Sequence, residues 1–254
     1  MARRVRSLIR LAMGLALLSG PGPLTPRAAA QTVDEIVTRH MAARGGLERW
    51  RAIRSLRMTG RVIAGPGREA LVVRETKRPG RVRTEFTFQG ITGVYAYDGT
   101  RGWQVSPLTG VVEPQTLEPE NTQAALEQAD IEGLLVSGAQ RGYTRTLIGR
   151  ETIAGREAHR IRLTPKTGPA VEQYLDAETY LLLRTDVTRQ LRGRTVQLET
   201  TYGDYRAVGG LMFPHTIEFG ARGRPGRAQI VVETVELNPV IDEARFRRPP
   251  ATRR

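Results

Sequence analysis

The stretch that decides the fold reads RVRTEFTFQ-GITGVYAYDG-TRGWQVS and covers residues 81–106. From Val82 to Phe88, apolar or threonine side chains at even positions alternate with arginine, glutamate or threonine at odd positions. A period of two places alternate side chains on opposite faces of a strand. The dipeptide Asp98-Gly99 favours a tight hairpin turn, because glycine readily adopts positive φ. The stretch therefore predicts three consecutive strands that share one apolar, aromatic-rich face.

The same pattern of short strands and turns continues through most of the chain from Ser55 onward. Further strands are expected at residues 56–62, 71–76, 143–148, 157–163, 171–175, 181–190, 195–205, 216–221 and 228–237. Evenly spaced hairpins of this kind are typical of an antiparallel sheet that curls or closes on itself. The fold class is predicted to be mainly β, an incomplete antiparallel barrel. Phe246, the large apolar residue of the C-terminal tail, is expected to fold back onto it.

Two helical regions accompany the strands. Thr32 and Glu35 form a capping box pattern, which predicts an amphipathic helix over Val33–Met41. A short second helix is expected over residues 47–53. The segment Asn121–Ala129 predicts a helix capped by Asn121 and inserted between hairpins, where it would act as a lid or plug.

Residues 1–30 have the order of a secretory signal peptide. Four arginines precede an apolar stretch at residues 11–18, and Ala28-Ala29-Ala30 offers a cleavage site. The alternative is a membrane anchor, but the apolar stretch is shorter than the roughly 20 residues that a spanning helix needs. We expect cleavage near Ala30, export to the periplasm of a bacterium with two membranes, and one domain over residues 31–254. No cysteine is present to form a disulfide or carry a lipid.

The chain is strongly basic, with a formal charge of +13 that falls to +8 without the five arginines of residues 1–30. A polyanion or an acidic lipid is one possible partner. The other interpretation is that the arginines stand on solvated strand faces beside glutamate and threonine, and we favour it. Nucleic acid is not an expected partner of an exported protein.

No motif in the sequence indicates catalysis. The three histidines, His40, His159 and His215, lack the spacing of a helical metal site. His215 could act as a general base, but a structural role is the simpler interpretation. Glu199 and Asp204 could pair with other carboxylates, although nothing in the sequence fixes their spacing. No enzyme activity, cofactor or metal is therefore expected.

Several stretches together resemble a known family. They are AIRSLRMTG at 52–60, AYDGTRGWQ at 96–104, YLDAET at 174–179, VGGLMFPH at 208–215 and LNPVIDEARF at 237–246. Along nearly the whole chain from Gln31, they resemble the LolA-like group, the outer membrane lipoprotein-sorting proteins. That resemblance implies an incomplete barrel around a helix-lidded apolar cavity that holds acyl chains of lipoproteins or other lipids.

The cavity is expected to be lined by inward-facing apolar and aromatic side chains. The candidates are Leu56, Met58, Phe86, Phe88, Tyr95, Tyr97, Trp103, Leu198, Ile217, Phe219, Ile230 and Val232. For Tyr95, Tyr97 and Trp103, stacking on a ligand and simple core filling are both open. The resemblance implies a carrier of acyl chains, and we expect it to be a monomer. The alternative is a lipid sensor of the same fold that binds a partner protein of the inner or outer membrane.

Overall fold

The computed structural model of the protein describes residues 31–191 and 193–250. The expected signal peptide, residues 1–30, lies outside the described residues. Among the helices of the described part, none has the length and apolar character needed to cross a bilayer.

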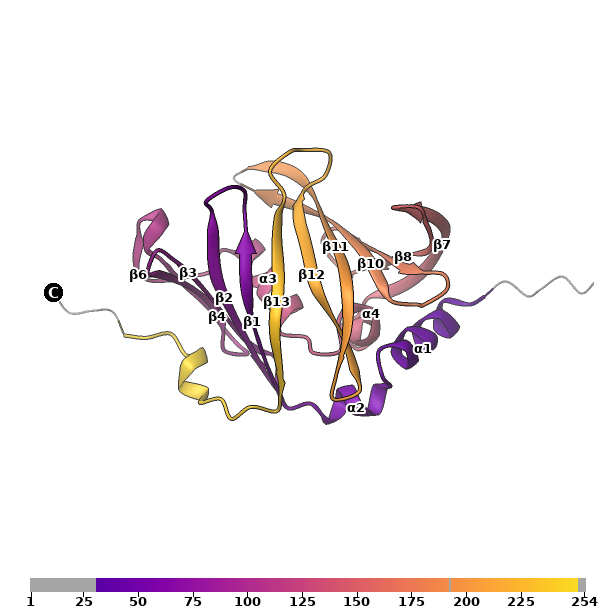
Figure 1. Cartoon of the computed structure of the whole chain (residues 1–254), viewed down its shortest axis with the longest axis horizontal. Helices are drawn as coiled ribbons and strands as arrows, with labels where there is room; N and C mark the ends of the chain where they lie inside the picture. Colours follow the sequence, from indigo (N-terminus) through magenta and orange to yellow (C-terminus); the bar gives the residue numbers. More distant parts are fainter. Residues whose placement is uncertain (1–30, 192, 251–254) are drawn as a thin grey trace, which may run out of the picture. The chain divides into compact units, whose positions relative to one another are not determined.

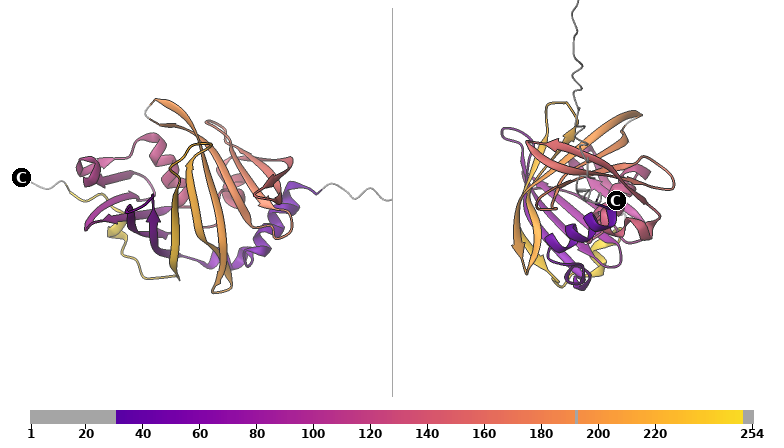
Figure 2. Two further views of the ribbon diagram at one scale, coloured as in Figure 1. Left: turned by 45° about the horizontal axis from the view of Figure 1, so that its top comes forward. Right: turned by 90° about the vertical axis from the view of Figure 1, so that its right-hand side faces the viewer.

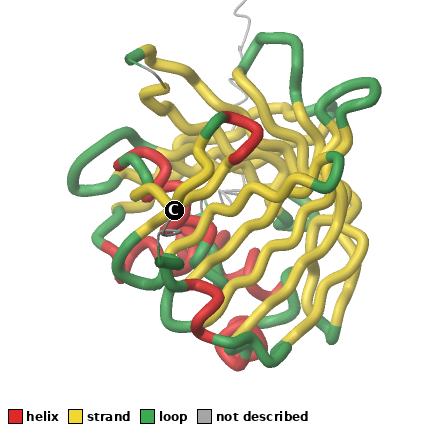
Figure 3. Tube along the Cα trace, turned by 90° about the vertical axis from the view of Figure 1, so that its left-hand side faces the viewer, coloured by secondary structure: helices red, strands yellow, loops and turns green. Residues whose placement is uncertain are grey.

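One antiparallel sheet dominates the described residues. Its thirteen strands are β1 (Ser55–Ile63), β2 (Glu69–Lys77), β3 (Arg81–Phe88), β4 (Ile91–Tyr97), β5 (Gly102–Ser106), β6 (Val111–Thr116), β7 (Thr144–Ile153), β8 (Arg156–Thr164), β9 (Val171–Asp176), β10 (Leu182–Leu191), β11 (Arg194–Val208), β12 (Leu211–Ala221) and β13 (Ala228–Leu237). Their order is β6-β5-β4-β3-β2-β1-β13-β12-β11-β10-β9-β8-β7. The sheet begins at β6, ends at β7 and curls without closing (Figures 1 and 3). The predicted incomplete barrel is confirmed.

The predicted three-strand meander is also confirmed, as β3, β4 and β5. The Asp98 carboxylate closes the turn between β4 and β5 by accepting hydrogen bonds from the backbone N–H groups of Thr100 and Arg101, both at 2.8 Å. The sequence did not indicate β6, because Pro114 interrupts its pattern. Proline is tolerated there because β6 is an edge strand.

Seven short helices accompany the sheet in the described part of the chain. They are α1 (Val33–Ala43), α2 (Leu47–Ala52), α3 (Pro119–Gln128), α4 (Leu134–Ser137) and the 3₁₀ helices η1 (Pro107–Thr109), η2 (Gly138–Arg141) and η3 (Glu243–Phe246). The capping box of Thr32 and Glu35 is present at the start of α1. The inserted helix begins at Pro119, so the prediction that Asn121 caps it is wrong. Proline fits the first helical turn, where its missing N–H would have no partner anyway.

The strand register defines two faces of the sheet. The face that we call concave carries Met58, Val72, Phe86 and Ile217, which pack into one apolar cluster with Ile230 and Val232. The opposite, convex face carries most of the charged side chains. Where β1 pairs with β13 the register shifts at Thr59/Gly60. A Cβ at Gly60 would lie 2.1 Å from the Val231 carbonyl oxygen, so only glycine fits this bulge.

The α-helices lie on the concave side. α1 and α4 pack on β8 and β9 through Ile36, Val37 and Leu135, together with Ile161 and Leu163. α1 and α2 lie together at one end of the sheet (Figures 1 and 2). We call this end of the concave face the helical end, and the end that bears the β3–β4 and β12–β13 turns the open end.

Helix α3 crosses the concave side. It packs against the neighbouring strands β3 and β4 and also against β10, which lies six or more places away from them in the strand order. Ala125 and Leu126 pack on Val82 and Tyr97, and Glu127 forms an ion pair with Arg189 of β10 at 2.6 Å. The inserted helix therefore lies over the interior of the curled sheet, as predicted.

The C-terminal segment folds back onto the convex face, as expected for Phe246, which is completely buried. The Trp103 indole Nε1 donates to the Phe246 carbonyl oxygen at 2.8 Å. Arg245 pairs with Glu75 at 2.7 Å and with Glu85 at 3.0 Å. These contacts hold η3 across β2, β3 and β5.

Candidate functional site

Register places most of the predicted cavity residues on the concave face. Met58, Phe86, Ile217, Ile230 and Val232 share one cluster there. Leu56 lies at the helical end with Trp50 and Phe213, and Tyr97 contacts α3. Leu198 on β11 pairs with Ala221, Phe219 on β12 pairs with Thr200, and Phe88 pairs with Ile91. Eleven of the twelve candidates thus share a face, although they are spread along it.

Trp103 is the exception, and its expected place in the cavity is corrected. Trp103 pairs with Ala96, and Gln104 pairs with Tyr95, so Trp103 lies on the face opposite to Tyr95 and Tyr97. It is buried under the C-terminal segment by its hydrogen bond to Phe246. The sequence showed an aromatic at a strand position but not the register that decides its face.

The open end of the concave face is incompletely covered by protein. Ile91 is 43% exposed, Phe219 37% and Tyr95 36%, although all three point to the concave side. Tyr95 lies edge-on to Phe86, with ring centroids 6.2 Å apart. Apolar side chains that face inward yet remain in contact with solvent are the expected lining of a ligand cavity.

The helical end contains a cavity of about 890 Å³. Its apolar lining comes from α1, α2 and the end of α3 and includes Val37, Met41, Leu47, Leu126 and Ile131. The volume falls in the range of about 300–1,000 Å³ that is typical of small-molecule sites. None of the twelve predicted residues lines it. The sequence indicated the two helices, but not that they leave this space between them.

Charged side chains also line that cavity, in pairs. Arg78 pairs with Glu132 at 2.6 Å, and Arg141 with Asp130 at 3.4 Å. Arg44 stacks on the Trp50 ring at 3.9 Å, and burial lowers its pKa to about 10. The lining of the cavity therefore combines apolar side chains with paired charges.

His40 lies on the buried face of helix α1. Its Nδ1–H donates to the Tyr180 carbonyl oxygen at 2.7 Å, which fixes the neutral tautomer. Burial, with a further contribution from the Arg44 charge, lowers the pKa of His40 to about 4, although the hydrogen bond to Tyr180 opposes the shift. His40 is therefore neutral at pH 7 and holds α1 to the β9–β10 turn.

The concave face also carries an arginine that the composition of the sequence did not indicate. Arg74 of β2 lies in the register between Met58 and Thr84. Its Nε is buried and has no hydrogen-bond partner among the described residues. The signal in the sequence was a charge at an inward position of an alternating strand, after Val72 and before Thr76.

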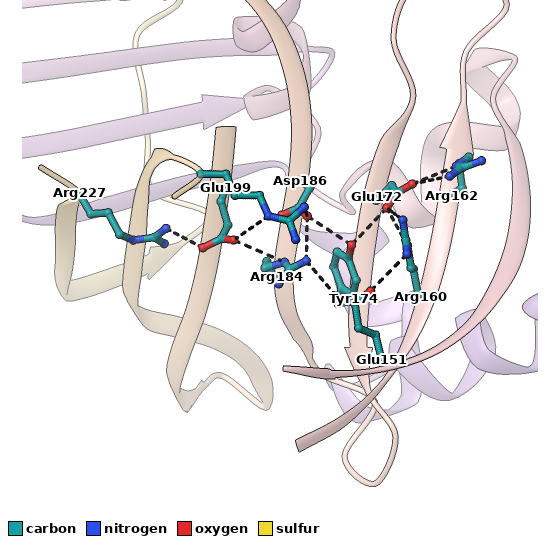
Figure 4. A network of polar contacts seen from close by, with 10 residues as sticks. Glu151, Arg160, Arg162, Glu172, Tyr174, Arg184, Asp186, Glu199 and Arg227 are labelled. Carbon is teal, nitrogen blue, oxygen red and sulfur yellow. Dashed lines mark hydrogen bonds and ion pairs between the residues drawn. The ribbon is translucent and has the colours of Figure 1, made fainter. Parts of the chain in front are cut away.

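The convex face carries a network of paired charges instead. Figure 4 shows it running from Arg162 and Glu172 through Tyr174 to Asp186, Arg184 and Glu199. Tyr174 is 1% exposed and lies 4.1 Å beneath the Arg184 guanidinium. Asp186 pairs with Arg184 at 2.9 Å, and Glu199 with Arg227 at 2.6 Å. The arginines of these strands stand beside acidic partners, as the favoured interpretation of the charge had predicted.

The candidate catalytic residues take part in ordinary structural contacts. His215 is buried, and its Nδ1 donates to the Phe213 carbonyl oxygen at 3.1 Å. Glu199 belongs to the convex network, and Asp204 pairs with Arg206 on the surface. No cluster of three or more acidic, histidine or cysteine side chains that could hold a metal occurs in the described residues.

Comparisons with known proteins agree with this geometry. The model of the MucB/RseB N-terminal domain family matches residues 104–201. No curated protein sequence matches the chain.

Three solved structures share the fold. A LolA superfamily protein from Nitrosomonas europaea has a TM-score of 0.58 at 15% identity, covering 86% of this chain and 98% of its own. A putative outer membrane lipoprotein-sorting protein domain from Vibrio parahaemolyticus has 0.57 at 13%, covering 85% and 97%. A DUF1329 family protein from Desulfovibrio piger has 0.59 at 12%, covering 86% and 98%. The resemblance to LolA-like proteins is confirmed at the level of the fold.

Proposed function

We propose that this chain, with its LolA-like fold, is a lipid-binding carrier. It takes up acyl chains of lipoproteins or other lipids on its concave face and moves them through the bacterial envelope. The observation that carries the proposal is the concave face itself. It carries a large apolar cluster, α3 crosses it, and Ile91, Tyr95 and Phe219 remain in contact with solvent toward its open end.

Physical chemistry explains why such a carrier is needed. Each CH₂ group that leaves water gains about 0.8 kcal/mol, so a free acyl chain does not cross an aqueous compartment at a useful rate. A strand of nine residues such as β1 extends about 30 Å at roughly 3.3 Å per residue. The concave face is therefore long enough for an extended chain, and the helical-end cavity adds room for its end.

The proposal includes export. Residues 1–30 would direct the chain to the periplasm and be removed near Ala30, leaving residues 31–254 as the working domain. N-terminal sequencing of protein recovered from the periplasm tests this part. A chain that still begins at Met1 would contradict it.

Two matched substitutions test the cavity. Phe219 and Leu71 are both exposed apolar residues, at 37% and 57%, but they lie on the concave and convex faces respectively. Phe219→Asp introduces a carboxylate where an acyl chain should lie, and burying it would cost several kcal/mol. We expect binding of a fluorescent fatty acid or lipopeptide to fall at least about tenfold, with Leu71→Asp unchanged.

Thermal melts of both variants separate loss of ligand from loss of fold. Both positions are solvent-exposed, so both variants should fold. Equal binding by the two folded variants, or no uptake of either probe by the unaltered protein, would contradict the carrier function.

A second candidate is a lipid sensor of the same fold that binds a membrane-protein partner. The family model that matches residues 104–201 is that of MucB/RseB, which supports this alternative. Purification from envelope membranes distinguishes the two. A carrier should yield lipid with the protein, and a sensor should yield a stoichiometric membrane protein that stays bound after lipid extraction.

A further inference from the structure

Arg74 is an uncompensated charge inside the fold. It is half-buried as a residue, and its Nε is closed to water with no hydrogen-bond partner in the described part of the chain. The described acidic side chains form no ion pair with it; Glu75, the next residue, points to the convex face and pairs with Arg57 and Arg245. Burial lowers the pKa of Arg74, but a guanidinium remains protonated in proteins at neutral pH.

The position of Arg74 on the concave face is fixed by its neighbours. Val72, two residues along β2, belongs to the concave apolar cluster with Met58, Phe86 and Ile217. Met58 and Thr84 flank Arg74 directly on β1 and β3. The guanidinium therefore stands between the packed helical end and the incompletely covered open end.

The facing wall of the curled sheet supplies further polar groups. Burial raises the pKa of Tyr202 on β11, a hydrogen bond with Thr185 and the Arg74 charge lower it, and the Glu127 charge of α3, which is paired with Arg189, raises it. Tyr202, Thr185 and Arg74 therefore lie near one another. Gln173 Oε1 is buried without a hydrogen-bond partner among the described residues, and Thr185 lies opposite Gln173 in the strand register. Both residues share the concave face with Val171, Leu175 and Val187.

A buried guanidinium Nε without a hydrogen-bond partner costs free energy, and folded proteins rarely leave one so. A bound anion would satisfy it. Arginine suits carboxylate and phosphate groups because its planar donors match two of their oxygens. The adjoining apolar cluster would hold a chain attached to that anion, running toward the open end.

We propose that Arg74 anchors the headgroup of an anionic amphiphile, a single phosphate or carboxylate whose acyl chain lies along Met58, Phe86 and Ile217. This rests on the proposed lipid-binding function and names its ligand class. Tyr202 and Thr185 complete the headgroup site from the opposite wall.

Calorimetric titration with two ligands of equal chain length, decyl phosphate and 1-decanol, tests the site. The unaltered protein should bind decyl phosphate roughly 10- to 100-fold more tightly, as expected for charge-assisted hydrogen bonds. Arg74→Met should remove this preference by weakening decyl phosphate binding, and leave 1-decanol binding unchanged or tighter. Arg74→Lys, which keeps the charge but not the planar donors, should retain part of the preference.

Arg61→Met is the matched control. Arg61 lies on the convex face of β1, where it pairs with Glu69 and Glu233, so its loss should not alter the preference. A thermal melt confirms that each variant is folded. If Arg74→Met does not fold, the Arg74→Lys titration and the preference of the unaltered protein still decide.

Each other outcome has a distinct meaning. Equal affinity of the unaltered protein for both ligands, or an undiminished preference in folded Arg74→Met, overturns the headgroup site and leaves the carrier function standing. Binding of neither ligand overturns the carrier function as well. Complete displacement of decyl phosphate by inorganic phosphate at similar concentration assigns the site to a free anion and overturns the amphiphile.

Discussion

The convex and concave faces of the sheet differ in whether a buried charged side chain has an ion-pair partner. On the convex face Asp186 is 3% exposed and pairs with Arg184, and Glu75 is 2% exposed between Arg57 and Arg245. On the concave face Arg74 has no such partner in the described chain. The difference teaches that the charges of the convex network belong to the fold, whereas Arg74, unlike Arg189, which pairs with Glu127 of α3, is free to meet the ligand that we propose.

The largest expected effect comes from breaking a convex pair. Asp186→Asn keeps the shape of the side chain but leaves Arg184, itself 8% exposed, without its nearest carboxylate. Removing one partner of a buried pair costs about 3 kcal/mol of unfolding free energy, which urea denaturation measures. Asp204→Asn, at an exposed pair with Arg206, is the control and should have no measurable effect. A similar small effect at Asp186 would contradict a structural role for the network.

As the pH falls, the contribution of His40 on α1 to the unfolding free energy should be lost before that of the convex carboxylates. The folded pKa of His40 is about 4 against a usual 6.5, so the unfolded chain binds a proton first. The stability that buried, neutral His40 contributes is fully present above about pH 6.5 and declines as the pH falls toward 4, by about 3 kcal/mol in all. The measurement is unfolding free energy against pH, with His40→Gln as the comparison. That variant should lose the slope in this window.

The convex carboxylates respond at lower pH. Burial opposes ionisation of Glu172, but hydrogen bonds from Arg162 and Arg160 bring its pKa below the usual value. Its contribution is therefore present above the ordinary glutamate pKa and is lost as pH falls below it. If His40→Gln kept the full slope between neutral pH and pH 4, burial of His40 would not be its source.

Removing the concave charge should have the opposite sign and a smaller size. Arg74→Met replaces an uncompensated buried cation by an apolar side chain of similar length. We expect the ligand-free protein to gain about 1–2 kcal/mol of unfolding free energy, measured by the same denaturation in lipid-free protein. A loss of stability would show that Arg74 has a structural partner.

The fold was largely predictable, because strand alternation and turn residues are local signals. The meander of residues 81–106 and the capping box at Thr32 needed no tertiary information. The start of α3 at Pro119 and the edge strand around Pro114 were missed. Proline is tolerated at these positions because one is the first turn of a helix and the other lies in an edge strand, which the local pattern does not show.

The candidate site was less predictable than the fold. Trp103 has the composition of a cavity residue, but register with Ala96 turns it to the convex face. The helical-end cavity depends on how α1, α2 and α3 pack, which no periodicity reports. Arg74 could have been noticed as a charge on an apolar stripe, but only the structure shows that the described residues offer it no partner.

The central claim is that the concave face holds the acyl chain. Photo-crosslinking with a fatty acid that carries a diazirine along its chain, followed by peptide mass spectrometry, tests it most directly. The account predicts adducts on concave residues such as Phe86 and Ile217, and their loss when unlabelled fatty acid is added in excess. Competable adducts confined to convex residues such as Leu71 would contradict it.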